Sequence, residues 1–219
     1  MAENVWSISA ESQTTFSWNY AGGREALLAL YEKGKNRQWN AGDRLDWSLP
    51  VDPDNPFGMR DDQIPIYGSA AWGKLDEKGR AEVRRHVACW QFSQFLHGEQ
   101  GGLMAVAKIV QTVPDIDAKF FAATQVVDEA RHAETYSRFL REKIGFTYAI
   151  DGSLQALFAD VVSDSRWDMT YLGVQILIEG LALAAFAVVR DSATNPLARA
   201  INAYVMEDEA RHVAFGRLA

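Results

Sequence analysis

The sequence is poor in cysteine and in basic charge, and each shortage excludes a class of protein. Its 219 residues include one cysteine, Cys89, so no disulfide can form within the chain. A lone thiol is typical of the reducing cytoplasm, where we expect the protein to reside. Lys and Arg number 22 against 29 Asp and Glu, which gives a net charge of −7. Such an acidic chain is poorly suited to nucleic acid or to an anionic membrane surface.

The sequence also lacks a secretory signal and a long uninterrupted apolar run. Residues 1–20 have no basic start followed by an apolar stretch. The most apolar run, 174–189, is short for a membrane span and has Glu179 near its middle. A carboxylate at that depth of a bilayer would be costly. We therefore expect a buried core helix and no membrane partner.

Proline is scarce outside one region, and its distribution indicates the helices. Four of the six prolines lie in a Gly-, Asp- and Asn-rich stretch, 41–73, which predicts a long irregular segment. No strand-like alternation is evident. Pro114 ends one long helix, Asp115 caps the next, Gly145 ends it and Pro196 opens the last. The predicted helices span 23–39, 81–113, 115–143, 153–162, 165–190 and 196–219.

An internal repeat is the most informative feature of the sequence. The pentapeptide Asp-Glu-Ala-Arg-His occurs at 128–132 and again at 208–212, an offset of 80 residues. A glutamate precedes each copy by the same interval, because Glu99 and Glu179 lie 30 residues before Glu129 and Glu209. The two halves of the region therefore match in motif and in spacing.

This spacing predicts a site for two metal ions. Glu and His three residues apart share one face of a helix. Thirty residues allow a chain to run up one helix, turn, and return to a similar height, since a helix rises about 1.5 Å per residue. Two such antiparallel hairpins can face each other with six side chains meeting in the middle. The predicted ligands are Glu99, Glu129, His132, Glu179, Glu209 and His212.

Four carboxylates and two imidazoles suit iron, although manganese or a mixed Mn/Fe pair accepts the same ligands. Two divalent ions balance four carboxylates, which would repel one another without metal. Asp128 and Asp208 are each expected to accept a hydrogen bond from the other motif's histidine, with Arg131 and Arg211 paired to them across the bundle. One copy of the motif alone would equally suit a solvated charged helix face, but two copies in register favour the metal site.

These motifs resemble those of the ferritin-like di-iron carboxylate oxygenase superfamily, especially p-aminobenzoate N-oxygenase-like and bacterial multicomponent hydroxylase-like proteins. The resemblance covers about 81–219. It implies an all-α, ferritin-like four-helix bundle, here with an N-terminal helix and a long irregular segment. It also implies that the ligands of each hairpin hold one iron, with one or two glutamates bridging the pair.

We expect two regions in the chain. Residues 1–74 would form an N-terminal extension packed on the bundle, and 75–219 the ferritin-like di-iron domain, which we expect to continue beyond Ala219. The segment 41–73 either covers the bundle or mediates a homodimer, and the sequence leaves both open.

Three positions bear on how far the resemblance extends. Val205 stands where the N-oxygenases have an extra histidine, and Leu183 where the multicomponent hydroxylases have a threonine. Tyr136, four residues after His132, resembles the radical tyrosine of the ribonucleotide reductase small subunit. It is more simply a core aromatic residue, and we expect it to form no stable radical.

Several other residues carry two interpretations. Gln125 and Gln175 each lie one turn before a predicted ligand, where they contact either substrate or a ligand carboxylate. His86 and His97 are interpreted as structural. Small residues could leave an apolar pocket beside the metals or simply allow close helix packing; these are Gly101, Gly102, Ala122 and Gly173.

The function that these features favour is an oxygenase. It would use dioxygen and an electron-donor protein to hydroxylate or N-oxygenate a small organic substrate. One alternative is a radical-generating or ligand-binding oxidase of the ribonucleotide reductase small-subunit type. Another is a ferroxidase or iron-storage protein, against which stand the long proline-rich segment and the apolar helix near Glu179.

Overall fold

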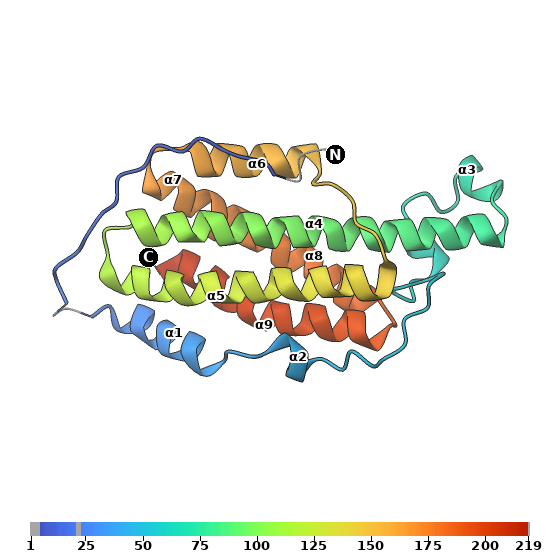
Figure 1. Ribbon diagram of the computed structural model, residues 1–219, viewed down its shortest axis with the longest axis horizontal. Coiled ribbons are helices and arrows are strands. Elements are labelled where there is room, and N and C mark those ends of the chain that lie inside the picture. The colour runs from blue at the N-terminus through green and yellow to red at the C-terminus, as the bar shows by residue number, and fades with distance from the viewer. Residues whose placement is uncertain (1–4, 21–22, 219) are drawn as a thin grey trace.

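Four long helices lie side by side in the computed structural model, which describes residues 5–20 and 23–218 (Figure 1). The described residues contain helices and irregular segments but no strand, so the predicted all-α, ferritin-like fold class is confirmed. Residues 1–4 and 21–22 of the predicted extension, and Ala219, lie outside the described residues.

The first hairpin pairs α4, Glu77–Thr112, with α5, Ile116–Phe139, which continues through a π-helical turn, Leu140–Ile144. The side chain of Asp115 accepts a hydrogen bond from the Ala118 amide and caps α5, as the sequence predicts. Gly145 ends the helix with φ +90°, where a residue with a Cβ would be strained. α4 begins four residues earlier than predicted, because Asp76 caps its first turn.

The second hairpin pairs a composite helix with α9, Pro196–Leu218. The composite helix consists of α7, Trp167–Tyr171, a π-helix, Leu172–Ile178, and α8, Glu179–Ser192. The sequence predicts this helix as a single α-helix, and the π-helix within it is a correction. A π-helix has a wider turn, and its last residue here directly precedes the predicted ligand Glu179.

The composite helix is less buried than the sequence predicts. Trp167–Ser192 is long and apolar enough to cross a membrane by length and composition alone, yet only 33% of its most apolar stretch is buried. Its inner side packs on α4 and α9, whereas Leu177 and Val188 on its outer side are more than half exposed. The expectation of a buried core helix is therefore wrong for the greater part of this helix, because only its inner side faces the bundle core.

The N-terminal segments pack along the bundle. They are α1, Glu25–Asn36; α2, Ala41–Arg44; a 3₁₀ turn, Asp61–Gln63; and α3, Ala70–Gly73. α1 lies against α5 and α9 (Figure 1). Within the irregular segment, Phe57 is fully buried, with its ring centroid 4.5 Å from that of Phe92. The segment therefore covers one end of the bundle core. A further helix, α6, Gly152–Ser163, packs against α4.

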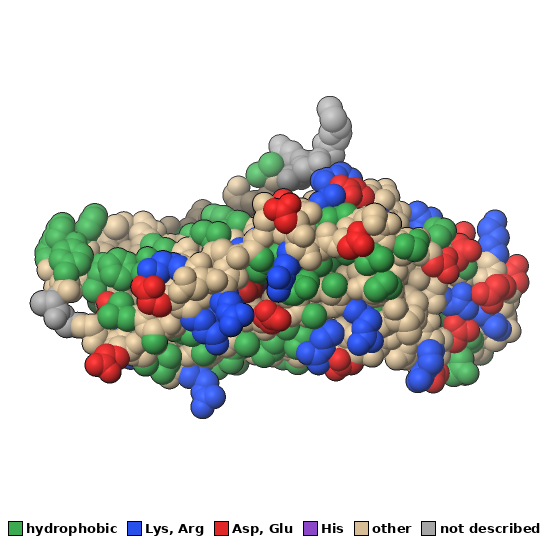
Figure 2. All heavy atoms as spheres, turned by 90° about the horizontal axis from the view of Figure 1, so that it is seen from below, with side chains coloured by type: hydrophobic (Ala, Val, Ile, Leu, Met, Phe, Trp, Pro, Cys, Tyr) green, Lys and Arg blue, Asp and Glu red, His purple; other side chains and the backbone are tan. Residues whose placement is uncertain are grey.

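The surface carries charges of both signs. On the face shown in Figure 2, acidic and basic side chains alternate among apolar ones and gather at the end of the molecule that holds α3. No extended basic area is visible on this face. This distribution agrees with the net charge of −7.

Candidate metal centre

The six predicted ligands meet in the middle of the bundle. α4 supplies Glu99, and α8 supplies Glu179 as its first residue. The two copies of the repeated motif lie on α5 and α9 and supply the other four side chains. All six residues are buried, with at most 4% of their surface exposed.

Their donor atoms form two sets, each compact enough to hold a metal ion. In each set the donor atoms lie within 4.8 Å of one another. One set is Glu99, Glu129, His132 and Glu209; the other is Glu129, Glu179 and His212. Glu129 belongs to both sets. Glu209 falls with Glu99 and His132, but it also lies 3.0 Å from Nδ1 of His212, so both motif glutamates contact donor atoms of both sets.

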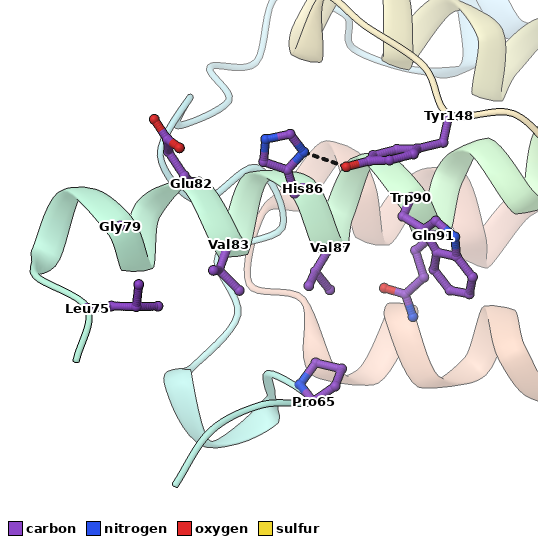
Figure 3. A pocket seen from close by; sticks show the side chains of 10 residues that line it. All are labelled: Pro65, Leu75, Gly79, Glu82, Val83, His86, Val87, Trp90, Gln91 and Tyr148. Atoms are coloured by element: carbon purple, nitrogen blue, oxygen red, sulfur yellow. Dashed lines mark hydrogen bonds between the residues drawn. The ribbon is translucent and has the colours of Figure 1, made fainter. Parts of the chain in front are cut away.

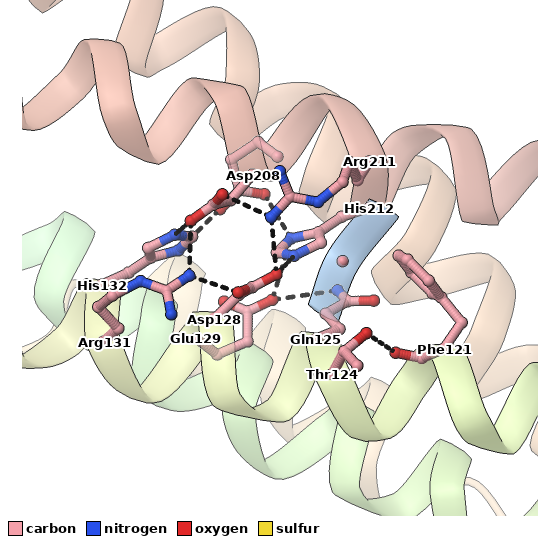
Figure 4. A network of polar contacts seen from close by, with 12 residues as sticks. Phe121, Thr124, Gln125, Asp128, Glu129, Arg131, His132, Asp208, Arg211 and His212 are labelled. Carbon is pink, nitrogen blue, oxygen red and sulfur yellow. Dashed lines mark hydrogen bonds and ion pairs between the residues drawn. The ribbon is translucent and has the colours of Figure 1, made fainter. Parts of the chain in front are cut away.

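Each histidine is held between this cluster and an aspartate of the opposite motif (Figure 4). Nδ1 of His132 lies 3.1 Å from Glu99 and 3.1 Å from Glu209. Its Nε2 lies 3.0 Å from Asp208. His212 repeats the pattern, with Nδ1 3.0 Å from Glu209 and Nε2 3.3 Å from Asp128. Both Nδ1 atoms thus face the carboxylates.

The two aspartates are ionised at neutral pH. Burial would raise the pKa of Asp128, but the hydrogen bond with His212 outweighs it and leaves the pKa at about 2. Burial would also raise the pKa of Asp208, but its hydrogen bonds with His132 and Arg131 outweigh burial and hold the pKa well below its usual range. An ionised carboxylate accepts a hydrogen bond from the Nε2–H group of the histidine, which leaves the Nδ1 lone pair free for a metal.

Arginines and two residues from the N-terminal segment complete this network. Arg131 donates to Asp208 at 2.8 Å, and Arg211 donates to Asp128 at 3.1 Å, so each arginine crosses the bundle. The loop after α1 also reaches the network. Gln38 donates to Asp128 at 2.8 Å, and Trp39 Nε1 donates to Asp208 at 2.8 Å.

Sequence analysis missed Gln38 and Trp39, because they lie 90 and 169 residues from their partners. Both fall at the end of the predicted helix 23–39, whereas α1 ends at Asn36. A polar and an aromatic side chain at the end of a predicted helix are too common to indicate contact with a metal centre.

On the other side of the cluster, one glutamine contacts the carboxylates directly and a second supports it. The Gln125 amide donates to Glu129 at 3.0 Å and to Glu179 at 2.7 Å. Gln175, from the π-helix, donates to the carbonyl of Gln125 at 3.0 Å. Of the two interpretations left open by the sequence, the structure shows hydrogen bonding to predicted ligands for Gln125, whereas Gln175 contacts Gln125 and no predicted ligand.

The protonation of the cluster indicates that it is built for cations. Burial raises the pKa of Glu99 to about 8, and the charge of Glu179 adds to this. Burial and Glu179 also raise the pKa of both Glu129 and Glu209. Burial would lower the pKa of His132, but its hydrogen bonds to Asp208 and Glu209 raise it to about 9. Without metal the cluster must hold protons, and divalent ions can replace them. The residues present therefore fit a dinuclear metal site.

A cavity of about 210 Å³ lies against the cluster. Glu99, Glu129, Glu179 and Glu209 line its inner end. Gly102 faces this region, since a Cβ there would lie 3.1 Å from the Glu129 carboxylate. Of the other small residues, Gly101 allows close packing of Phe158, and Gly173 allows close packing of Val161.

A larger groove, of about 690 Å³, runs along the N-terminal half of α4 (Figure 3). Its lining includes Trp90 and His86, whose Nδ1 lies 2.6 Å from the Tyr148 hydroxyl, but none of the predicted ligands. His97 contacts the Tyr148 carbonyl at 2.9 Å. Both histidines therefore have structural partners, away from the cluster.

Tyr136 is fully buried among aromatic rings and donates to Asn202 at 3.1 Å. Burial raises the pKa of its hydroxyl well above the usual value. These contacts are those of a core aromatic residue.

Comparison with known proteins places the chain in a family. The sequence model of P-aminobenzoate N-oxygenase AurF matches residues 21–219. No curated protein matches the sequence. A solved structure of R2-like ligand-binding oxidase with aerobically reconstituted Mn/Fe cofactor has a similar fold, with a TM-score of 0.60 and 19% identity. The match covers 91% of this chain and 68% of that chain. A substituted form of the same oxidase, with anaerobically reconstituted Mn/Fe cofactor, gives a TM-score of 0.62 at 18% identity, covering 91% and 72%.

Proposed function

The chain belongs to the p-aminobenzoate N-oxygenase family, and on this premise we propose that it is a di-iron oxygenase that oxidises a small organic substrate. The observation that carries the proposal is the cavity of about 210 Å³, whose inner end is formed by the four buried glutamates. A substrate in this cavity lies next to the cluster. Family membership favours N-oxygenation over hydroxylation, although Val205 replaces the extra histidine seen in the N-oxygenases.

The residues that would hold the metals are Glu99, Glu129, His132, Glu179, Glu209 and His212. Glu129 and Glu209 are the candidates for bridging ligands, because Glu129 belongs to both sets of donor atoms and Glu209 lies 3.1 Å from His132 Nδ1 and 3.0 Å from His212 Nδ1. A pair of iron ions supplies the redox chemistry that dioxygen activation requires, which no side chain of this cluster can supply.

The surrounding side chains prepare the site for this chemistry. Asp128 and Asp208 accept hydrogen bonds from the Nε2–H groups of the histidines, so that each imidazole presents Nδ1 to the cluster. Gln125 restrains Glu129 and Glu179 through two hydrogen bonds. The apolar walls of the cavity exclude water from the reacting groups.

The test loads purified protein anaerobically with two equivalents of Fe(II) per chain, followed by dioxygen, a chemical reductant and a panel of candidate substrates. Aryl amines, alkylbenzenes and aliphatic compounds would form the panel. We expect substrate-dependent dioxygen uptake, and a product that contains ¹⁸O when ¹⁸O₂ is supplied. Glu129→Gln provides the control, because it removes the shared carboxylate.

Two results would contradict the proposal. Dioxygen uptake that continues in step with added iron, without organic product, would indicate iron storage. Full activity after reconstitution with manganese alone, and none with iron, would contradict the choice of metal. An iron and manganese analysis of the loaded protein accompanies the assay for this reason.

A further inference from the structure

The cavity beside the metal centre has walls that are almost entirely apolar. The side chains contributed by α6 are Leu154 and Leu157, and α8 and the π-helix contribute Ile178, Leu181, Ala182, Ala185 and Phe186. α4 contributes Phe95 and Gly98. Leu181 is 68% exposed and so stands at the mouth. A ligand would therefore pass an apolar mouth and apolar walls before it reaches the glutamates.

Gln94 is the one polar lining residue outside the cluster of glutamates, and both ends of its amide are occupied. Its Nε2 donates to the Ala149 carbonyl at 3.0 Å, and its Oε1 accepts from the Asp151 amide at 2.7 Å. These bonds fix the loop that leads into α6. The Gln94 side chain thus serves the fold and has little capacity left for a ligand.

The cavity also lacks a positive charge to receive an anion. Its lining residues, all within the described part of the chain, include no Lys, Arg or His. Arg131 and Arg211 are committed to the aspartates on the other side of the histidines. Two divalent ions would be balanced by the four glutamates, so the loaded centre carries no excess positive charge in its reduced state.

We infer that the cavity selects a neutral, predominantly apolar substrate about the size of a substituted benzene ring and discriminates against carboxylates. The inference rests on the proposed function and deepens it. A carboxylate taken past the mouth and walls of this cavity would lose its hydration without gaining a hydrogen-bond or charge partner from the lining side chains, which is strongly unfavourable. The size follows from the volume of 210 Å³, since a cavity of about 150 Å³ already holds benzene. p-Aminobenzoate itself is therefore a poor ligand for this chain.

The first experiment measures binding, with no turnover. Protein loaded with Fe(II) and kept anaerobic is titrated calorimetrically with matched pairs that differ in one charge, namely aniline and 4-aminobenzoate, and methyl 4-aminobenzoate and 4-aminobenzoate. We expect the neutral member of each pair to bind at least about tenfold more tightly. Equal or tighter binding of 4-aminobenzoate would overturn the inference.

The second experiment introduces the missing charge. Leu181→Lys places a flexible cation at the mouth, where the exposed position tolerates it, and should raise the affinity for 4-aminobenzoate severalfold relative to the affinity for aniline. Val188→Lys is the matched control, because Val188 is 58% exposed on the same helix but does not line the cavity. An equal gain in 4-aminobenzoate affinity in both variants would show a general effect of added positive charge. It would contradict the inference that the cavity mouth discriminates against carboxylates.

A third pair of variants tests whether ligands occupy this cavity. Ala185→Phe fills part of it and should weaken aniline binding about tenfold or more, whereas Ala184→Phe changes an exposed neighbour and should not. Unchanged binding in Ala185→Phe would overturn the assignment. Failure of the proposed function is distinguishable, because neutral ligands would then bind with the expected preference but yield no oxidised product.

Discussion

The two hairpins carry the same pentapeptide, but the residues around it differ in polarity. Gln125 lies one turn before Glu129, and the equivalent position 80 residues later is Val205. Conversely, Phe95 lies one turn before Glu99, and its equivalent is Gln175. Gln125 donates to Glu129 and Glu179, and Gln175 donates to Gln125, whereas Val205 and Phe95 lie with the apolar core around Phe92.

This difference gives the metal centre a polar side and an apolar side. The repeat duplicates what the metals require, which is one Glu and one Glu-x-x-His per hairpin. The flanking positions are not duplicated, because one side must hold carboxylates in place and the other must leave an apolar cavity lined by Phe95. The repeated residues therefore form the candidate metal site, and the residues that differ between the hairpins form the hydrogen-bonded side and the apolar cavity beside it.

The largest effect on metal content is expected when a glutamate of the metal centre is replaced. Glu129 belongs to both sets of donor atoms, and Glu209 lies within 3.1 Å of Nδ1 of both histidines, whereas Glu179 belongs to one set. We expect Glu129→Gln and Glu209→Gln to retain less than one metal ion per chain and Glu179→Gln to retain about one, because a neutral amide is a weak ligand for these hard cations. Elemental analysis after anaerobic loading and desalting measures this. Identical metal contents in the three variants would mean that the motif glutamates are not shared between the two metal ions.

A smaller effect is expected at the aspartates that hold the histidines. Asp208→Asn and Asp128→Asn each remove the ionised acceptor of an Nε2 proton, and loss of such a partner typically costs about 10–100-fold in metal affinity. We expect the larger loss in Asp208→Asn, since Asp208 lies closer to its histidine, at 3.0 Å against 3.3 Å. Competition with a chelator measures the affinities. Asp43→Asn, an exposed change in α2, is the control.

Exchanging the flanking residues tests the asymmetry directly. Gln125→Val removes the donor to two buried carboxylates, and Val205→Gln buries an amide in an apolar core. Each is expected to lower the free energy of unfolding by about 1–3 kcal/mol. The double variant should be less stable than either single variant, as followed by denaturant unfolding. A double variant as stable as the parent would show that the two sides are interchangeable.

The sequence predicts the parts of this molecule that depend on local periodicity. The long helices, their ends at Pro114 and Gly145, and the meeting of Glu99 with the Glu-x-x-His pairs follow from helix geometry and from a repeat of fixed spacing. The contact between His132 and Asp208 also follows, because two antiparallel copies of one motif place each aspartate near the other's histidine.

Features that depend on packing between distant segments could not be predicted in this way. The π-helix before Glu179 has no periodic signature, although one hint exists at Gly216, the equivalent of Tyr136. A Cβ at Gly216 would lie 2.4 Å from the Gln175 carbonyl oxygen, so glycine is needed where the π-helix approaches α9. The shape of the cavity likewise depends on how α6 packs against α4, which no local sequence pattern specifies.

The smallest expected effect on metal affinity concerns Trp39, which contacts one residue of each hairpin. Its Nε1 donates to Asp208 at 2.8 Å, and its ring lies 4.8 Å from the Arg131 guanidinium. Trp39→Phe keeps a ring but removes the hydrogen bond to a charged acceptor, which should cost about 1.5–3 kcal/mol of stability.

The control for Trp39 is Trp47→Phe, which removes a hydrogen bond to the Ala41 carbonyl at 2.7 Å. Because that acceptor is neutral and remote from the cluster, we expect a loss of about 0.5–1.5 kcal/mol and an unchanged metal affinity. Trp39→Phe should in addition weaken metal binding severalfold, since Asp208 would then be held less firmly against His132. Denaturant unfolding of the metal-free protein gives the first quantity and chelator competition the second. If both variants lost stability but kept full metal affinity, the N-terminal segment would stabilise the bundle without tuning the metal centre.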